Sequence, residues 1–187
     1  MTVPVSGEGL SGIRELVLGQ FEVSWALFEY HLQRLTPDDL LWEPAALCWT
    51  VRPDATGTWQ ADWSDDALDP IPVPTIGWLS WRVGWWWTTA IAHAQGVVPP
   101  ERAAVRWPGD LAGTLHWMRV LRDEWTHVLE DADDSWLAKP IAFPWPPESG
   151  RSVADLFAWV NVELTKNAAE IGQLRLIRAA APEALAG

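Results

Sequence analysis

The sequence predicts an all-α fold, a four-helix bundle with long loops rich in proline and tryptophan. Three observations support this prediction. Four long segments carry apolar residues at helical spacing, residues that cap helices precede most of them, and no alternating strand pattern occurs. A length of 187 residues suits one hydrophobic core, so we expect residues 1–187 to form a single domain.

The first helix is expected to begin at Ser11, which acts as its N-cap, and to run to about Leu35. A short second segment then restarts the helical pattern. Thr36 is placed to cap this segment and Pro37 takes its first helical position, where a missing N–H costs nothing. This short helix is expected to end near Trp42.

Three further long helices are expected at about 76–94, 110–130 and 153–180. Thr75 is placed to cap the first of these three, and Gly96 to end it. Ser152 and Asp155 have the spacing of a capping box ahead of the last helix. Each of these signals is local, so the helix ends are predicted independently of one another.

A long loop is expected between the first two long helices, at about 43–75. It holds five prolines and a run of aspartates, which break the helical pattern, and also Trp49, Trp59 and Trp63. Long loops inside compact domains are uncommon and are often functional. With so many aromatic side chains, this loop is expected to pack on the helices.

Composition and charge exclude several classes of partner. The formal net charge is −12, and no basic face is visible, so binding to nucleic acid or to an acidic membrane surface is not expected. The most apolar stretch, 73–98, carries Arg82 near its middle and is interpreted as a core helix, not as a membrane span. The single cysteine, Cys48, fits a reducing compartment, so we expect a cytoplasmic protein.

Four passages resemble the DinB/YfiT-like superfamily, which includes actinobacterial thiol-dependent transferases and isomerases. They are LTPDDLLWEP at 35–44, CWTVRP at 48–53, PTIGWLSWRV at 74–83 and WVNVELTKNAAEIG at 159–172. Together they span nearly the whole chain. The resemblance implies a four-helix bundle of DinB/YfiT type that acts on or binds a small organic molecule. By resemblance alone, it also implies a thiol cofactor such as mycothiol.

The resemblance further implies a metal site that this sequence does not reproduce. In this superfamily three side chains commonly hold nickel or zinc, one from the second long helix and two from the fourth. Here these positions fall on Arg82, with Glu163 and Asn167 in one register or Lys166 and Glu170 in the other. Arginine and lysine keep their protons at neutral pH and cannot be ligands. We therefore expect no metal and no other bound cofactor, with a thiol such as mycothiol implied by the resemblance alone.

Two interpretations of these charged residues stay open. In the structural one, Arg82 forms a salt-bridged network with Glu163 or Glu170, joined by Lys166. In the functional one, Arg82 anchors an anionic or carbonyl-bearing ligand, and Glu163 or Glu170 serves as acid or base. The candidate catalytic residues are Arg82, Glu163 and Glu170.

An aromatic surface is expected beside Arg82. Trp78, Trp81 and Trp85 recur at a spacing of three or four residues and so share one helical face with it. They form either plain core packing or an aromatic pocket near the loop. The candidate ligand-binding residues are Trp49, Arg52, Trp78, Trp81, Trp85, Lys166 and Asn167.

Three hypotheses for function follow: a transferase or isomerase relative, a non-catalytic module that binds a small ligand, and a dimeric structural bundle. The resemblance implies pairing through the helices, so a homodimer is expected. Histidine and cysteine chemistry is not expected to contribute. No two of His31, His93, His116 and His127 have the spacing of metal ligands, and no histidine lies near Cys48 in the sequence.

Overall fold

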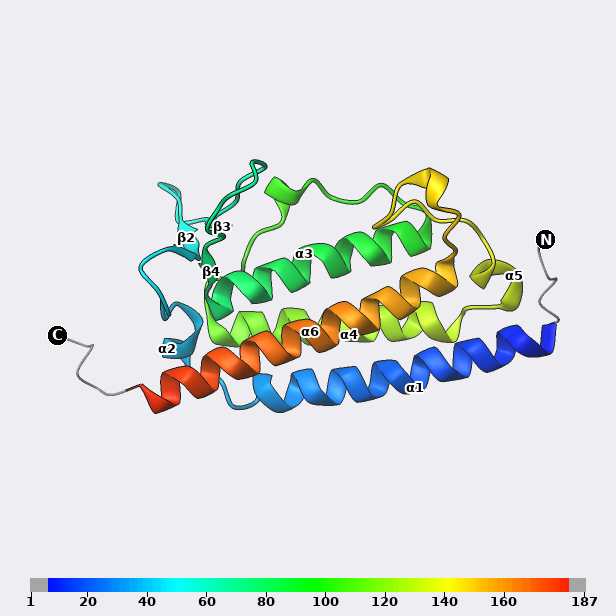
Figure 1. The fold of residues 1–187 in the computed structure, drawn as a ribbon, viewed down its shortest axis with the longest axis horizontal. Helices are drawn as coiled ribbons and strands as arrows, with labels where there is room; N and C mark the ends of the chain where they lie inside the picture. The colour runs from blue at the N-terminus through cyan, green and yellow to red at the C-terminus, as the bar shows by residue number, and fades with distance from the viewer. Residues whose placement is uncertain (1–6, 182–187) are drawn as a thin grey trace.

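The protein is built from four long helices that lie side by side around one core (Figure 1). The structure is a computed structural model that describes residues 7–181, and their side chains from residue 12 onward. The long helices are α1 (Gly7–Leu32), α3 (Ile76–Gln95), α4 (Leu111–Glu130) and α6 (Val153–Ala180). The predicted all-α class is confirmed.

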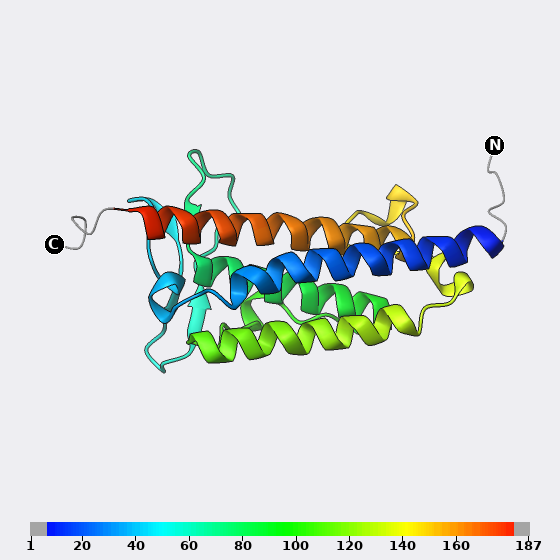
Figure 2. The same cartoon turned by 90° about the horizontal axis from the view of Figure 1, so that it is seen from below.

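The helices form two parallel pairs that run in opposite directions. Helices α1 and α6 point one way and α3 and α4 the other (Figures 1 and 2). Arg14 Nη2 donates to the carbonyl of Glu130 (2.9 Å), and Arg119 pairs with Glu29 (2.8 Å), so opposite ends of α1 and α4 meet. The parallel pair α3 and α4 requires residues 96–110 to run back along the molecule.

Most helix ends lie where the sequence places them. Thr75 accepts a hydrogen bond from the backbone N–H of Trp78 (3.2 Å), and Gly96 ends α3 with a positive φ of 70°. Ser152 and Asp155 form the predicted capping box ahead of α6. The prediction for Ser11 is wrong, because α1 already begins at Gly7 and Ser11 lies within it.

Shorter elements occupy the loops. Helix α2 (Pro37–Leu40) follows Thr36, whose backbone N–H donates to the Asp39 carboxylate (2.6 Å). Three others were not predicted: η1 (Arg102–Ala104), α5 (Asp134–Leu137) and η2 (Pro147–Ser149). None of the helices within residues 7–181 has the length and apolar composition of a membrane span.

The long loop contains four short strands that were not expected from its sequence. Strand β1 (Cys48–Trp49) pairs in parallel with β4 (Val73–Pro74), and β2 (Val51–Pro53) pairs antiparallel with β3 (Trp59–Ala61). Strands of two or three residues are too short to show an alternating pattern, which explains why they were missed.

The turn between β2 and β3 is held by one carboxylate. Asp54 accepts hydrogen bonds from Thr56, Gln60 and the backbone N–H of Thr58, and Gly57 supplies the positive φ of 83°. These bonds, that from the Thr56 side chain first, lower the pKa of Asp54 to about 2. The carboxylate is therefore ionised at neutral pH and remains a full acceptor for the turn.

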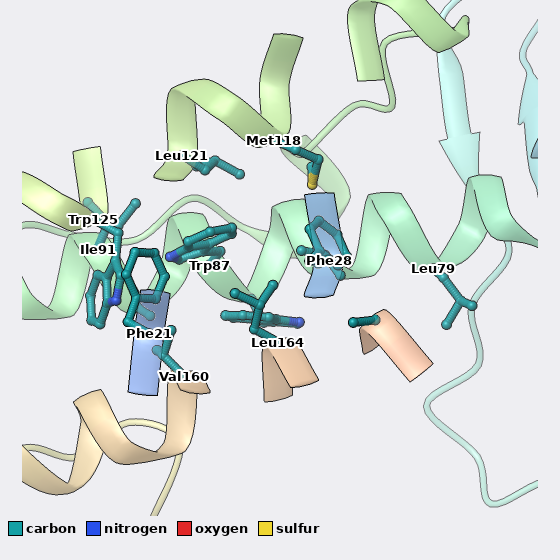
Figure 3. Packing of buried hydrophobic residues seen from close by; sticks show 14 of the residues in the cluster. Phe21, Phe28, Leu79, Trp87, Ile91, Met118, Leu121, Trp125, Val160 and Leu164 are labelled. Carbon is teal, nitrogen blue, oxygen red and sulfur yellow. The ribbon is translucent and has the colours of Figure 1, made fainter. Parts of the chain in front are cut away.

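Helix α3 lies at the centre of the core. Fifteen of its 20 residues are buried, so it is covered by neighbours on nearly every side. Its Trp87 is fully buried and packs edge-on against Phe21 of α1 (6.0 Å between ring centroids). Trp125 of α4 and Leu164 of α6 complete this layer (Figure 3).

Helices α3 and α4 approach closely at Gly84. A Cβ added there would lie 1.9 Å from the ring of Trp117, so the α4 ring occupies the space that any side chain would need. We predict that Gly84→Ala lowers the free energy of unfolding by about 1–3 kcal/mol, the usual result of overpacking. Chemical denaturation followed by circular dichroism measures this.

The matched control is Gly12→Ala in α1, where an added Cβ meets nothing within 4 Å. This change should leave stability equal or raise it by up to about 1 kcal/mol, because alanine favours helix over glycine. If both variants behaved alike, the close approach at Gly84 would not constrain the fold.

His93, near the end of α3, stacks on Phe143 of the 138–152 loop (4.9 Å between ring centroids). Burial lowers the pKa of His93 below its ordinary value of about 6.5. The fold therefore favours the neutral ring. Its contribution to stability is complete above about pH 6.5 and decreases as the pH falls from there toward the lower folded-state pKa.

We predict that the protein is less stable at pH 5.5 than at pH 7.5, and that His93→Phe reduces this dependence on pH while keeping an aromatic ring against Phe143. Urea midpoints at both pH values measure the effect. His31 remains as a second contributor, because burial, followed by the nearby Arg175 and Arg34, lowers its pKa as well. An unchanged dependence in His93→Phe would contradict the assignment to His93.

Candidate functional site

Arg82 is the only charged residue of α3 apart from a histidine near the C-terminal end of the helix. Its side chain is 31% exposed and lies across from α6, where its Nη2 is 3.9 Å from Glu163 Oε2. The Glu163 side chain is only 17% exposed. Arg82 thus brings a charged group from the mostly buried helix α3 partly to the surface, and we take its surroundings as the candidate site.

Lys166 adds a second cation. One helical turn after Glu163, its ammonium group pairs with the same Oε2 atom that faces Arg82. One carboxylate thus serves two cations, and the group carries a net positive charge in a strongly acidic chain. An excess of positive charge in a partly buried setting favours an anion.

Asn167 and Glu170 form a separate polar pair beside this group. Asn167 is fully buried, its Oδ1 accepts from the indole N–H of Trp86 (3.1 Å), and its Nδ2 donates to Glu170 Oε2 (2.6 Å). The ion pairs within the described residues join Arg82 to Glu163 and not to Glu170. The sequence left open whether Glu163 or Glu170 pairs with Arg82, and in the structure the partner is Glu163.

The tryptophans named from the sequence do come together. Trp49 stacks on Trp78 (5.0 Å between ring centroids), and Trp81 stacks on Trp85 (6.1 Å). Trp63 packs against all four rings, at centroid distances of 5.6–6.3 Å. These five rings, which we call the tryptophan cluster, cover the first half of α3.

The cluster is joined to the charged group through Trp78. The guanidinium carbon of Arg82 lies 5.9 Å from the Trp78 ring centroid, within the range of a cation–π interaction. The Trp78 N–H donates to the carbonyl of Asp62 (2.7 Å), which fixes the ring. Arg52 approaches the same Asp62 (3.7 Å) and Glu43 (3.4 Å), so it borders the cluster from the loop.

Two residues of this region were missed as site residues. Trp63 is the central ring of the cluster, and Arg102 covers it, with the guanidinium carbon 4.0 Å from the ring centroid. Arg102 also pairs with Asp65 (2.9 Å), which accepts the Trp63 N–H (3.0 Å). No spacing in the sequence links Arg102 to a ring 39 positions earlier, so only the folded chain reveals the contact.

A comparison with protein-family models identifies the chain. The model described as DinB superfamily matches residues 20–171, which include α3 and most of α6. The chain belongs to the DinB superfamily. No curated protein and no solved structure matches it significantly. The match covers Arg82, Glu163, Lys166, Asn167 and Glu170, so the site described above lies within the DinB part of the chain.

The donor atoms of this DinB protein do not fit the metal that the superfamily resemblance implies. The guanidinium of Arg82 can only donate hydrogen bonds, and Glu163 is engaged by two cations. Asn167 uses its oxygen for Trp86. Within the described residues, no group of three or more His, Cys, Asp or Glu side chains is placed to hold a metal ion.

We predict that the protein purified without an affinity tag carries far less than one divalent metal ion per chain, measured by elemental mass spectrometry. Incubation with nickel or zinc followed by desalting should not change this, because Arg82, where the resemblance implies a metal ligand, keeps its proton and cannot coordinate a metal. Arg82→His, which places an imidazole opposite Glu163, should retain more zinc than the wild type. A stoichiometric metal in the wild type would contradict this assignment of the site.

Proposed function

We propose that the protein binds a small organic anion at Arg82, with the carboxylate or a similar group of the ligand held by the guanidinium. The observation that carries this proposal is the hydrogen bonding of the Arg82 guanidinium. Its ion pair with Glu163 is 3.9 Å long, beyond hydrogen-bond distance, and no side-chain hydrogen bond of the guanidinium occurs among residues 12–181. The N–H groups of this partly exposed guanidinium are therefore available to a ligand.

The chemistry of the ligand follows from the donor geometry. A guanidinium presents parallel N–H groups that match the two oxygens of a carboxylate, and such charge-assisted pairs are stronger than neutral hydrogen bonds. Arg82 is 31% exposed, so its charge is less screened than on an open surface. Lys166 adds a second positive charge near the same point.

The rest of the ligand is expected to be aromatic or hydrophobic. Trp78, next to Arg82, belongs to the tryptophan cluster, and Trp49, Trp63 and Trp85 of the same cluster are partly exposed. Small-molecule sites commonly combine apolar aromatic walls with a few placed polar groups. The expected ligand class is therefore an aryl or alkyl carboxylate.

The contacts of Glu163 and Glu170 favour binding over catalysis. Glu163 faces two cations, and Glu170 is held by Asn167, so each carboxylate already has partners in the resting structure. Superfamily membership by itself implies neither a transferase or isomerase reaction nor a thiol such as mycothiol. The cytoplasmic location likewise stays a prediction.

We predict that phenylacetate binds the wild-type protein, measured by calorimetry with tryptophan emission as a second readout, and that uncharged phenylacetamide binds far more weakly. Arg82→Ala should weaken phenylacetate binding about 10- to 100-fold, the effect of losing a charged hydrogen-bond donor. The affinity of Arg82→Lys for phenylacetate should lie between those of the wild type and Arg82→Ala, since lysine keeps the charge but not the paired donors.

Arg151→Ala is the matched control, because Arg151 is an exposed arginine that pairs with Asp155 and lies over Trp145, outside the tryptophan cluster. It should bind phenylacetate as the wild type does. Glu163→Gln should bind more tightly, because the competing carboxylate is gone. Circular dichroism establishes that each variant is folded. Equal affinity in Arg82→Ala and the wild type, or a panel of aryl and alkyl carboxylates without a binder, would contradict the proposal.

A further inference from the structure

Trp63 differs from the other four rings of the tryptophan cluster in the backbone that carries it. Trp49 lies in strand β1, and Trp78, Trp81 and Trp85 lie in helix α3. Trp63 instead belongs to the segment 63–72 between β3 and β4, which contains no helix or strand. The ring at the centre of the cluster therefore comes from an irregular loop segment.

Few contacts hold the segment 63–72 against the molecule. Within the described part of the chain, its backbone forms no hydrogen bond outside the segment, and the nearest backbone bonds to other strands are those of Asp62 and Val73, at its two ends. Most of its residues are exposed, and Trp63 itself is 37% exposed. Segments with few buried contacts and few backbone hydrogen bonds are those that open at the lowest free energy.

The Trp63 ring is held in place by the Asp65 carboxylate and by Arg102. Asp65 accepts hydrogen bonds from the Trp63 N–H (3.0 Å) and from Arg102 (2.9 Å), and the guanidinium carbon of Arg102 lies 4.0 Å from the Trp63 ring centroid. The 96–110 loop that carries Arg102 lies over the same side of α3 as the segment (Figure 1). The Asp65 side chain is 83% exposed, and ion pairs this exposed contribute little to stability.

The other four rings form a slot that matches an indole in shape. The Trp63 ring is nearly parallel to those of Trp49 and Trp78, with interplanar angles of 10° and 11°. It meets Trp81 and Trp85 edge-on, at 64° and 69°. Parallel offset and edge-on contacts are the two arrangements that aromatic rings favour. We call the space that these four rings leave for Trp63 the Trp63 slot.

We propose that the Trp63 slot is the subsite for a bicyclic aromatic ring of the ligand, and that Trp63 leaves the slot when the ligand binds. This inference rests on the proposed function, in which Arg82 holds the carboxylate of the ligand. Trp78 links the two places, because it contacts both Trp63 (6.3 Å between ring centroids) and Arg82 (5.9 Å). The ligand class is thereby narrowed to a bicyclic aryl carboxylate with a short arm between its ring and its carboxylate.

Such a ligand can replace Trp63 because it makes one interaction that Trp63 cannot make. An indole side chain has only an N–H donor, so Trp63 has no acceptor for the donors of Arg82. A bicyclic aryl carboxylate takes over the ring contacts of Trp63, including that with Arg102, and adds a charge-assisted pair with Arg82. In the unliganded protein Trp63 fills the slot, so Trp78 and Trp81 stay 3% exposed.

The slot is tested with free indole, which is uncharged and binds without Arg82, by titration calorimetry of the full-length protein. Trp63→Ala should bind indole at least about 10-fold more tightly than the wild type, because the slot is then vacant. Asp65→Ala should bind indole about 3- to 10-fold more tightly than the wild type, because the hydrogen bond and ion pair that keep Trp63 in the slot are lost.

Asp66→Ala is the matched control. Asp66 is the next residue of the same segment, and within the described residues its carboxylate forms no hydrogen bond or ion pair. This variant should bind indole as the wild type does. Circular dichroism shows whether each variant is folded, and Asp65→Ala, which keeps all five rings, tests the proposal even if Trp63→Ala is unfolded.

Indole-3-propionate tests the link between the slot and Arg82. It should bind Asp65→Ala more tightly than indole does, and adding Arg82→Ala to this variant should remove the difference while leaving the affinity for indole within about 2-fold. Equal affinity of the wild type and Asp65→Ala for indole would overturn the proposal, because Trp63 would then be fixed packing. So would a Trp63→Ala variant that is folded and binds no indole.

The two proposals fail in different ways. If indole binds Asp65→Ala as expected but neither phenylacetate nor indole-3-propionate depends on Arg82, the slot stands and the anion site at Arg82 is wrong. If phenylacetate binding depends on Arg82 but indole does not distinguish Asp65→Ala from the wild type, the anion site stands and the slot is wrong.

Discussion

Helix α3 must be covered on nearly every side, and much of the structure follows from this constraint. An apolar helix with several large indole rings cannot leave one face to water, as a surface helix does. Helices α1, α4 and α6 cover part of it, and the loops cover much of the rest. The indole N–H groups of Trp78 and Trp81 donate to the carbonyls of Asp62 and Val105, and that of Trp107 donates to Ser80. These bonds attach the loops at 41–75 and 96–110 to α3.

The same constraint determines where chemistry can occur. On α3 the guanidinium of Arg82 reaches the surface at one place, next to α6, and it meets Glu163 and Lys166 there. The buried pair of Asn167 and Trp86 anchors the neighbouring turn of α6, so the backbone that carries Glu163 and Lys166 is held in place. Rigid positioning of partly buried charges is what a small binding site requires, because little side-chain entropy remains to be lost on binding.

Helix α6 contributes to the core, to the site and to the outer surface of the molecule. Its apolar stripe enters the core, its charged turn meets Arg82, and Val162 and Leu176 are exposed on its outer side. Lys166 lies between the charged turn and this outer side, because it pairs with Glu163 and also lines the groove between α1 and α6.

The sequence by itself determined the all-α class, the positions of α3, α4 and α6 to within about one residue, and the caps at Thr75, Gly96 and Ser152, because helical periodicity and capping depend on neighbours within a few positions. It also selected Arg82, Glu163 and the tryptophans as candidates. Only the tertiary structure decided that Glu163 is the partner of Arg82, that Trp63 and Arg102 complete the cluster, and that the loop forms short strands. These features join residues far apart in the chain, and local sequence carries no information on which distant side chains the packing of the helices brings into contact.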